Sequence, residues 1–183
     1  MKKKRIYHLD MVFFCTFFLG ILLANLLQGK SKNRFFMLNE YYLQQFKYTK
    51  INTNQFFFYV VENRLPIFAL LLLLSFTVVG ILTHIVFVSY YGLSFGFLCV
   101  MAITNFGWKG FFYVIGFLFP HYLLYLFCYL LFLKIFYRKK EGQHTEQKTM
   151  ILQIGVVLIL FLIGMLLEGY VNPVLLSKIL KIF

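Results

Sequence analysis

The apolar residues of this chain occur in blocks that are too long for the core of a soluble protein. From Pro66 to Tyr137 the sequence is almost continuously apolar, with only scattered polar residues. A helix of a soluble protein is apolar on one face, whereas these segments are apolar all round. Runs of about 18 or more such residues are typical of transmembrane helices. Hydrophobic residues make up 61% of the chain and charged residues 13%, which is about half the charged share of a typical globular protein. We therefore expect an all-α bundle of membrane-spanning helices.

Polar and helix-breaking residues divide this bundle into about five predicted spans within one membrane domain that covers residues 1–183. The expected segments are span 1 at 11–27, an outer loop at 29–65, span 2 at 66–88, span 3 at 91–104, a half-helix and span 4 within 110–137, and span 5 at 150–167. The half-helix has two interpretations: a re-entrant piece, or the start of a longer span 4.

The outer loop contains a second periodic pattern. Residues 34–50 carry apolar side chains at helical spacing, with polar residues on the other side. The apolar positions are Phe35, Leu38, Tyr42 and Phe46. This pattern predicts an amphipathic helix that lies on the membrane or against the bundle.

The net charge of +12 comes from basic residues that lie almost entirely outside the apolar blocks. Basic residues in this position set the orientation of membrane spans and contact lipid head groups, so we expect lipid rather than nucleic acid as the partner. The clusters Lys2–Arg5 and Arg138–Lys140 are dense and close to spans. With five spans, both lie on the cytoplasmic side of the plasma membrane, with the N-terminus cytoplasmic and the C-terminus outside. No small-residue cleavage site follows span 1, which we interpret as an uncleaved signal anchor.

Four polar residues are expected near the outer leaflet at helix ends: Asn105, Lys109, His121 and Glu168. Ionisable groups at membrane depth are costly, so each is a candidate for a specific role. We predict that the Glu168 carboxylate lies close to at least one of the other three, in a site shared with Asn172. Three interpretations stay open: a structural polar knot, a docking or ligand site, and a proton or ion relay. Pro120 and Pro173 adjoin this group and are further structural or docking candidates.

Gly92 and Gly96 form a GxxxG pair that would let helix backbones approach closely, either inside the bundle or in self-association. Cys15, Cys99 and Cys128 have no metal-ligand spacing, and the sequence contains no catalytic motif that we can identify. We expect a protein that is not an enzyme and has no metal or cofactor.

The region from Tyr90 to Leu133 and the last span carry a set of residues that resembles the stage II sporulation protein M family. The matching positions are Gly92, Ser94, Gly96, Phe97, Phe106, Gly107, Gly110, Pro120, His121, Leu124, Tyr125, Glu168 and Pro173. The resemblance implies a non-enzymatic membrane component of the engulfment machinery in sporulation. It also implies two peptidoglycan-degrading partners, stage II sporulation proteins D and P, that the family recruits to the septal membrane.

Two classes of function follow from these observations. The first is a multi-pass scaffold that localises cell-wall hydrolases. The alternative is a small transporter or permease subunit, which would need a polar path through the bundle. The polar residues are expected at one end only, and this favours the scaffold.

Overall fold

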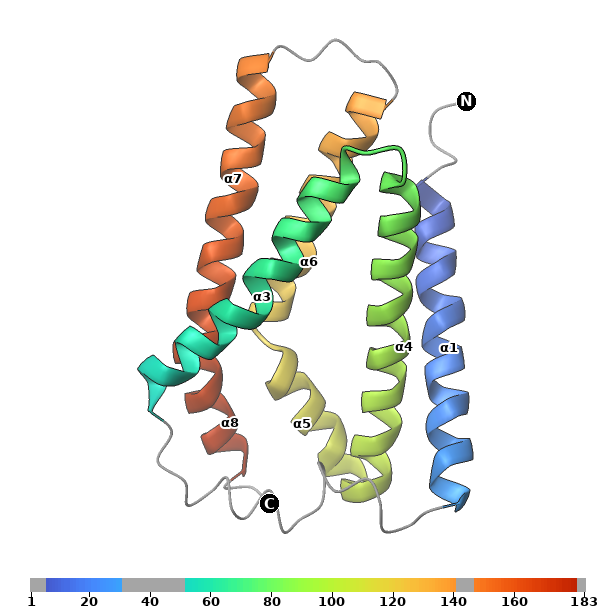
Figure 1. The fold of residues 1–183 in the computed structure, drawn as a ribbon. Coiled ribbons are helices and arrows are strands. Elements are labelled where there is room, and N and C mark those ends of the chain that lie inside the picture. Colours follow the sequence, from blue (N-terminus) through green and yellow to red (C-terminus); the bar gives the residue numbers. More distant parts are fainter. Residues whose placement is uncertain (1–5, 31–51, 141–146, 181–183) are drawn as a thin grey trace. The chain divides into compact units, whose positions relative to one another are not determined.

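The computed structural model describes residues 6–30, 52–140 and 147–180, and these residues contain helices and short turns but no strand. The elements are α1 (Ile6–Lys30), α3 (Thr53–Ser75), α4 (Gly80–Phe106), α5 (Trp108–Leu118), α6 (His121–Lys140), α7 (Gln147–Leu166), a π-helical turn η2 (Leu167–Val171) and α8 (Asn172–Leu180) (Figure 1). The expected all-α class is confirmed. The predicted amphipathic helix at 34–50 lies outside the described residues.

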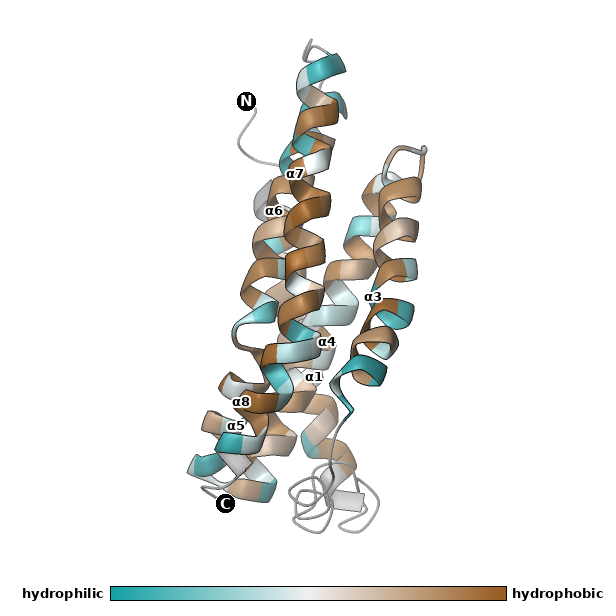
Figure 2. Cartoon of the chain, turned by 90° about the vertical axis from the view of Figure 1, so that its left-hand side faces the viewer, coloured by the Kyte–Doolittle hydropathy of each residue, from teal (hydrophilic) through white to brown (hydrophobic). Residues whose placement is uncertain are grey.

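Several of these helices are long and apolar enough to cross a membrane. By length and composition there are four within the described residues: Leu9–Leu27, Thr53–Ser75, Gly80–Phe106 and Gln147–Lys178. The number rises to five if α5 and α6, which are bent by 56° at the break between them, form one span. Figure 2 shows hydrophobic residues along most of α7. The protein is therefore a membrane protein.

The helix boundaries in the middle of the chain differ from the predicted ones. The expected helix at 66–88 is wrong, because α3 ends at Ser75 and α4 begins at Gly80. Helix α3 starts at Thr53, inside the segment predicted as an outer loop, and Pro66 lies within it rather than at its start. The expected span at 91–104 is the C-terminal part of the longer helix α4.

Two side-chain hydrogen bonds lie at the break after Ser75, where the next residues are still apolar. The Ser75 hydroxyl donates to the Leu71 carbonyl, and the Thr77 hydroxyl donates to the Leu74 carbonyl at 2.7 Å. Such bonds offer the backbone an alternative to the regular helical ladder. The buried His84 ring lies on the other side of this turn, with its Nε2 at 3.2 Å from the Ser75 hydroxyl.

The described residues form two compact units. The first contains residues 6–30, 71–115 and 179–180, and the second contains residues 52–70, 116–140 and 147–178. The single membrane domain expected from the sequence stays a prediction.

In the first unit, α1 and α4 pack at very short range through glycine. A Cβ atom on Gly96 would overlap the Phe17 carbonyl oxygen, and one on Gly20 would overlap the Leu93 carbonyl oxygen. A Cβ atom on Gly92 would likewise overlap the Thr16 hydroxyl. Gly92 and Gly96 thus contact another helix of the same chain, in the close approach that small residues permit. Self-association through them stays a prediction.

The end of α4 turns directly into α5 within the same unit. Gly107 takes a φ of 57° between the two helices, a conformation that favours glycine because it has no Cβ atom. A Cβ atom on Gly110 would overlap the Ala102 carbonyl oxygen, so a second glycine lets the first turn of α5 fold back on α4.

Candidate functional site

The second unit contains an ion pair between α3 and the π-helical turn η2. The Arg64 guanidinium contacts the Glu168 carboxylate through Nη2 to Oε1 at 2.6 Å and through Nε to Oε2 at 3.0 Å. The side chains are 27% and 11% exposed. A guanidinium that meets both oxygens of a carboxylate forms one of the strongest hydrogen-bonded pairs in proteins.

A third helix joins this pair through Tyr125 of α6. The Tyr125 hydroxyl donates to Glu168 Oε2 at 2.8 Å, and the Arg64 guanidinium carbon lies 5.8 Å from the centre of the Tyr125 ring. We call Arg64, Tyr125 and Glu168 the ionic cluster. It connects α3, α6 and η2 at one level of the second unit.

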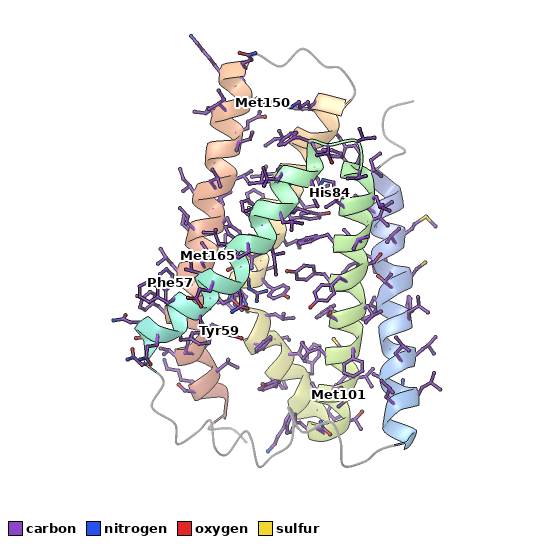
Figure 3. The ribbon with its side chains drawn as sticks, in the orientation of Figure 1. Phe57, Tyr59, His84, Met101, Met150 and Met165 are labelled. Atoms are coloured by element: carbon purple, nitrogen blue, oxygen red, sulfur yellow. The ribbon has the colours of Figure 1, made fainter. Side chains whose placement is uncertain are left out.

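One face of α3 positions Arg64 against η2. Phe57, Arg64 and Phe68 are spaced by seven and four residues, so they lie on the same side of the helix. Phe57 stacks on Tyr170 with ring centres 5.4 Å apart, and Phe68 stacks on Phe161 at 4.0 Å. Helix α3 therefore runs antiparallel to α7 and η2. The ion pair lies between the Phe57–Tyr170 and Phe68–Phe161 contacts. Phe57 is labelled in Figure 3.

The π-helical turn has a cause in the sequence. Pro173 has no backbone N–H, and its ring would clash with the carbonyl four residues earlier in a regular α-helix. In η2 the Asn172 N–H bonds the Leu167 carbonyl, five residues back. Gly169 allows η2 to pack closely on Phe57 of α3, because a Cβ atom at Gly169 would collide with that side chain. Single π-helical turns of this kind are frequent at functional sites.

His121 lies beside the ionic cluster at the start of α6, directly after Pro120. Its ring is 1% exposed, makes an edge-on contact with Tyr125 at 6.0 Å between ring centres, and is within electrostatic range of Glu168 and Arg64. Its Nδ1 atom has no hydrogen-bond partner among the described residues, and the same holds for Oδ1 of Asn172. Asn172 is 4% exposed, four residues after Glu168.

The contacts between α6 and α7 place the ionic cluster far from the basic residues at the end of α6, Arg138 to Lys140. Tyr125 packs on Phe161, and the Cys128 thiol donates to the Val157 carbonyl, so the two helices are antiparallel. Helix α6 has 20 residues, which corresponds to about 30 Å at about 1.5 Å per residue. His121 begins that helix and Lys140 ends it, so the two ends are about one hydrocarbon thickness apart.

The structure brings together part of the predicted site. His121 and Glu168 both contact Tyr125 in the second unit, and Asn172 and Pro173 follow directly after η2. Asn105 lies in the last turn of α4 and Lys109 in the first turn of α5, both in the first unit, so their place beside Glu168 stays a prediction.

Sequence reasoning missed the two residues that bind the Glu168 carboxylate directly. Arg64 was assigned to the outer loop, although it stands immediately before the apolar run that begins at Leu65. Tyr125 stands one helical turn after His121, a spacing that could have indicated a shared face. No group of three or more His, Cys, Asp or Glu residues that could hold a metal ion occurs in the described part of the chain.

Comparison with known proteins gives one match. A sequence model of the family described as Stage II sporulation protein M matches residues 11–173. This range includes most of α1, all of the ionic cluster and Pro173. No curated protein and no solved structure matches the chain.

Proposed function

Because the chain belongs to the stage II sporulation protein M family, we propose that it is a multi-pass plasma-membrane scaffold, not itself an enzyme, that recruits peptidoglycan hydrolases during engulfment. The observation that carries this proposal is the ionic cluster, which joins α3, α6 and η2 in the second unit. The partners, stage II sporulation proteins D and P, are those that the family resemblance implies.

A scaffold requires a surface of fixed shape, and the cluster supplies a physical means to fix one. The Glu168 carboxylate accepts hydrogen bonds from two different helices, so movement of either α3 or α6 would remove one of the two partners of a nearly buried charge. Removal of one member of such a pair is far more costly than the net stabilisation that the pair provides. The cluster therefore favours one arrangement of the helix ends.

The proposal includes an orientation. With Arg138–Lys140 on the cytoplasmic side, as the positive-inside rule favours, the antiparallel helices α6 and α7 carry the ionic cluster to the outer face. The same orientation puts the N-terminus in the cytoplasm. Peptidoglycan lies outside the plasma membrane, so a scaffold for its hydrolases would need its docking surface on that face.

Replacement of Glu168 by glutamine tests the proposal. The glutamine side chain keeps the shape but loses the charge, so the hydrogen bonds to Arg64 and Tyr125 weaken and the helix ends become less fixed. We expect the protein to remain inserted and the recovery of tagged hydrolase partners from native membranes to fall about fivefold, the effect of losing about 1 kcal/mol in charge-assisted hydrogen bonding. Asp10→Asn, at an exposed acid of α1, is the matched control and should leave recovery unchanged. Equal recovery with Glu168→Gln and the native chain would count against the proposal.

A transporter or permease subunit is the second candidate, and interrupted helices are the observation that favours it. Pro66 lies inside α3, α5 and α6 meet at a 56° bend, and η2 interrupts the last helix. Discontinuous helices surround the substrate sites of many transporters. However, α6 meets α7 through the Tyr125 ring against Phe161 and Gly164 and through the Cys128–Val157 contact. This mainly apolar packing gives the scaffold the better support.

A further inference from the structure

The turn between α4 and α5 exposes a tryptophan almost completely. Trp108 is 88% exposed and is the single tryptophan of the sequence. It follows Gly107, whose φ of 57° ends α4, and it is the first residue of α5. The polar residues Asn105 and Lys109 stand close to it in the chain and are exposed as well. This turn of the first unit therefore carries an indole ring and polar groups on one exposed segment.

The length of α4 places this turn relative to the bilayer. Helix α4 has 27 residues, which corresponds to about 40 Å along its axis, and it is a candidate membrane span over its whole length. The hydrocarbon layer is about 30 Å thick, and the bilayer with its head-group regions is about 40–45 Å thick. As a span, α4 therefore crosses the hydrocarbon and extends about 5 Å into the head-group region at each end.

Helix α1, which is also a candidate span, gives the same level independently. Its contacts pair Thr16 with Gly92 and Phe17 with Gly96, so α1 and α4 run parallel in the first unit (Figure 1). Helix α1 ends at Lys30, and from this register the ends of the two helices lie within about one helical turn of each other. Two neighbouring spans thus end at the level of the α4–α5 turn.

The chemistry of the turn suits the boundary of the bilayer better than it suits hydrocarbon or bulk water. The Lys109 ammonium and the Asn105 amide would be costly inside hydrocarbon. A fully exposed indole ring in bulk water would leave a large apolar surface hydrated. Indole rings are enriched at the level of the lipid head groups, where the ring contacts acyl chains and the N–H finds polar partners. The boundary therefore accommodates both kinds of side chain.

We propose that the α4–α5 turn binds the head-group layer of the bilayer through Trp108, with lipid as the partner of this surface. The inference goes beyond the proposed function and does not depend on it, because it holds for either orientation of the chain. The Trp108 ring fixes the depth of α4 in the membrane. Because Gly110 lets the first turn of α5 pack on α4, the same contact fixes the depth at which α5 begins.

Fluorescence of the native protein tests this inference, because the emission comes from Trp108 alone. The purified full-length chain is reconstituted into phosphatidylcholine vesicles that carry a quencher at one of two depths. One lipid has a spin label on its head group, and the other has bromine atoms near the ends of its acyl chains. We expect the head-group quencher to reduce the emission about twofold more than the deep quencher, because about 15 Å of hydrocarbon separates the two depths.

A second tryptophan position provides the matched control. The variant Trp108→Phe with Tyr90→Trp moves the indole to a site on α4 where the native aromatic side chain is 66% exposed. Tyr90 lies about 5 Å from the middle of α4 along its axis. The order of the two quenchers should therefore reverse in this variant, with the deep bromine atoms quenching more strongly.

Three results would overturn the inference. Stronger quenching of native Trp108 by the deep bromine atoms would put the indole inside the hydrocarbon. Weak quenching by both lipids, together with strong quenching by aqueous iodide, would put the turn in bulk water. Weak quenching by both lipids and by iodide would mean that protein covers the indole, as in contact with a second copy of the chain.

Discussion

Replacement of Arg64 by methionine is expected to lower the free energy of unfolding by about 3 kcal/mol, because it leaves the nearly buried Glu168 carboxylate without its cationic partner. This figure is at the lower end of the range for broken buried pairs, since the Arg64 side chain is 27% exposed and water screens part of the interaction. The Tyr125 hydroxyl alone would remain to bind the carboxylate. Unfolding of the purified protein in detergent micelles, followed by circular dichroism, measures the change.

The double variant Arg64→Met with Glu168→Leu is the control for this experiment. It removes both charges, so no unpaired carboxylate remains, and paired apolar replacements of buried ion pairs are often close to neutral. We expect the double variant to recover most of the lost stability. A double variant that is no more stable than Arg64→Met would mean that the lost packing of the arginine, and not the orphaned charge, causes the effect.

Replacement of Gly96 by leucine is expected to destabilise the first unit by about 3 kcal/mol. The Cβ atom of the new leucine would overlap the Phe17 carbonyl oxygen, so α1 and α4 would have to separate. Overpacking of a tight contact costs about 1–3 kcal/mol or more. The contact is between backbones, which cannot move aside as a flexible side chain can. The same unfolding measurement in micelles applies.

Gly155→Leu provides a matched glycine substitution within α7. A Cβ atom at Gly155 meets no atom within 4 Å, and leucine has a better helix propensity than glycine. This variant should be as stable as the native chain or slightly more stable. If both leucine variants lose the same stability, the close packing of α1 on α4 is not the reason for the effect at Gly96.

The membrane class and part of the site follow from the sequence for clear physical reasons. Long apolar runs determine a helical membrane protein because backbone groups in lipid must bond within the helix. The cost of a charge in such runs also selected Glu168 and His121, both of which contact Tyr125 in the second unit.

The arginine partner of Glu168 could not be predicted because the start of α3 was misjudged. Thr53 to Arg64 includes asparagine, glutamine, glutamate and arginine, a composition that indicated a loop. The structure shows that Phe57 and Arg64 of this segment contact η2 and that Val60 is buried. A search for continuous apolar runs does not find a helix segment that has one polar side.

The break between α3 and α4 was missed for a related reason. Phe76, Val78 and Val79 are apolar and continue the hydropathy of the preceding helix. Average hydropathy therefore gives no sign of the turn at residues 76–79.

The side of the membrane that the ionic cluster faces tests the central claim most directly. A hydrolase scaffold of the proposed kind must present its docking surface outside the cell. With the three native cysteines replaced, a single cysteine at Asn54, which accepts a hydrogen bond from the Tyr170 hydroxyl, should react with an impermeant maleimide in intact cells. A single cysteine at Gln143, next to the basic cluster, should react only after the membrane is permeabilised. Labelling of Gln143→Cys in intact cells, with Asn54→Cys protected, would put the ionic cluster on the cytoplasmic side of the membrane. That result would contradict a role in recruiting cell-wall hydrolases.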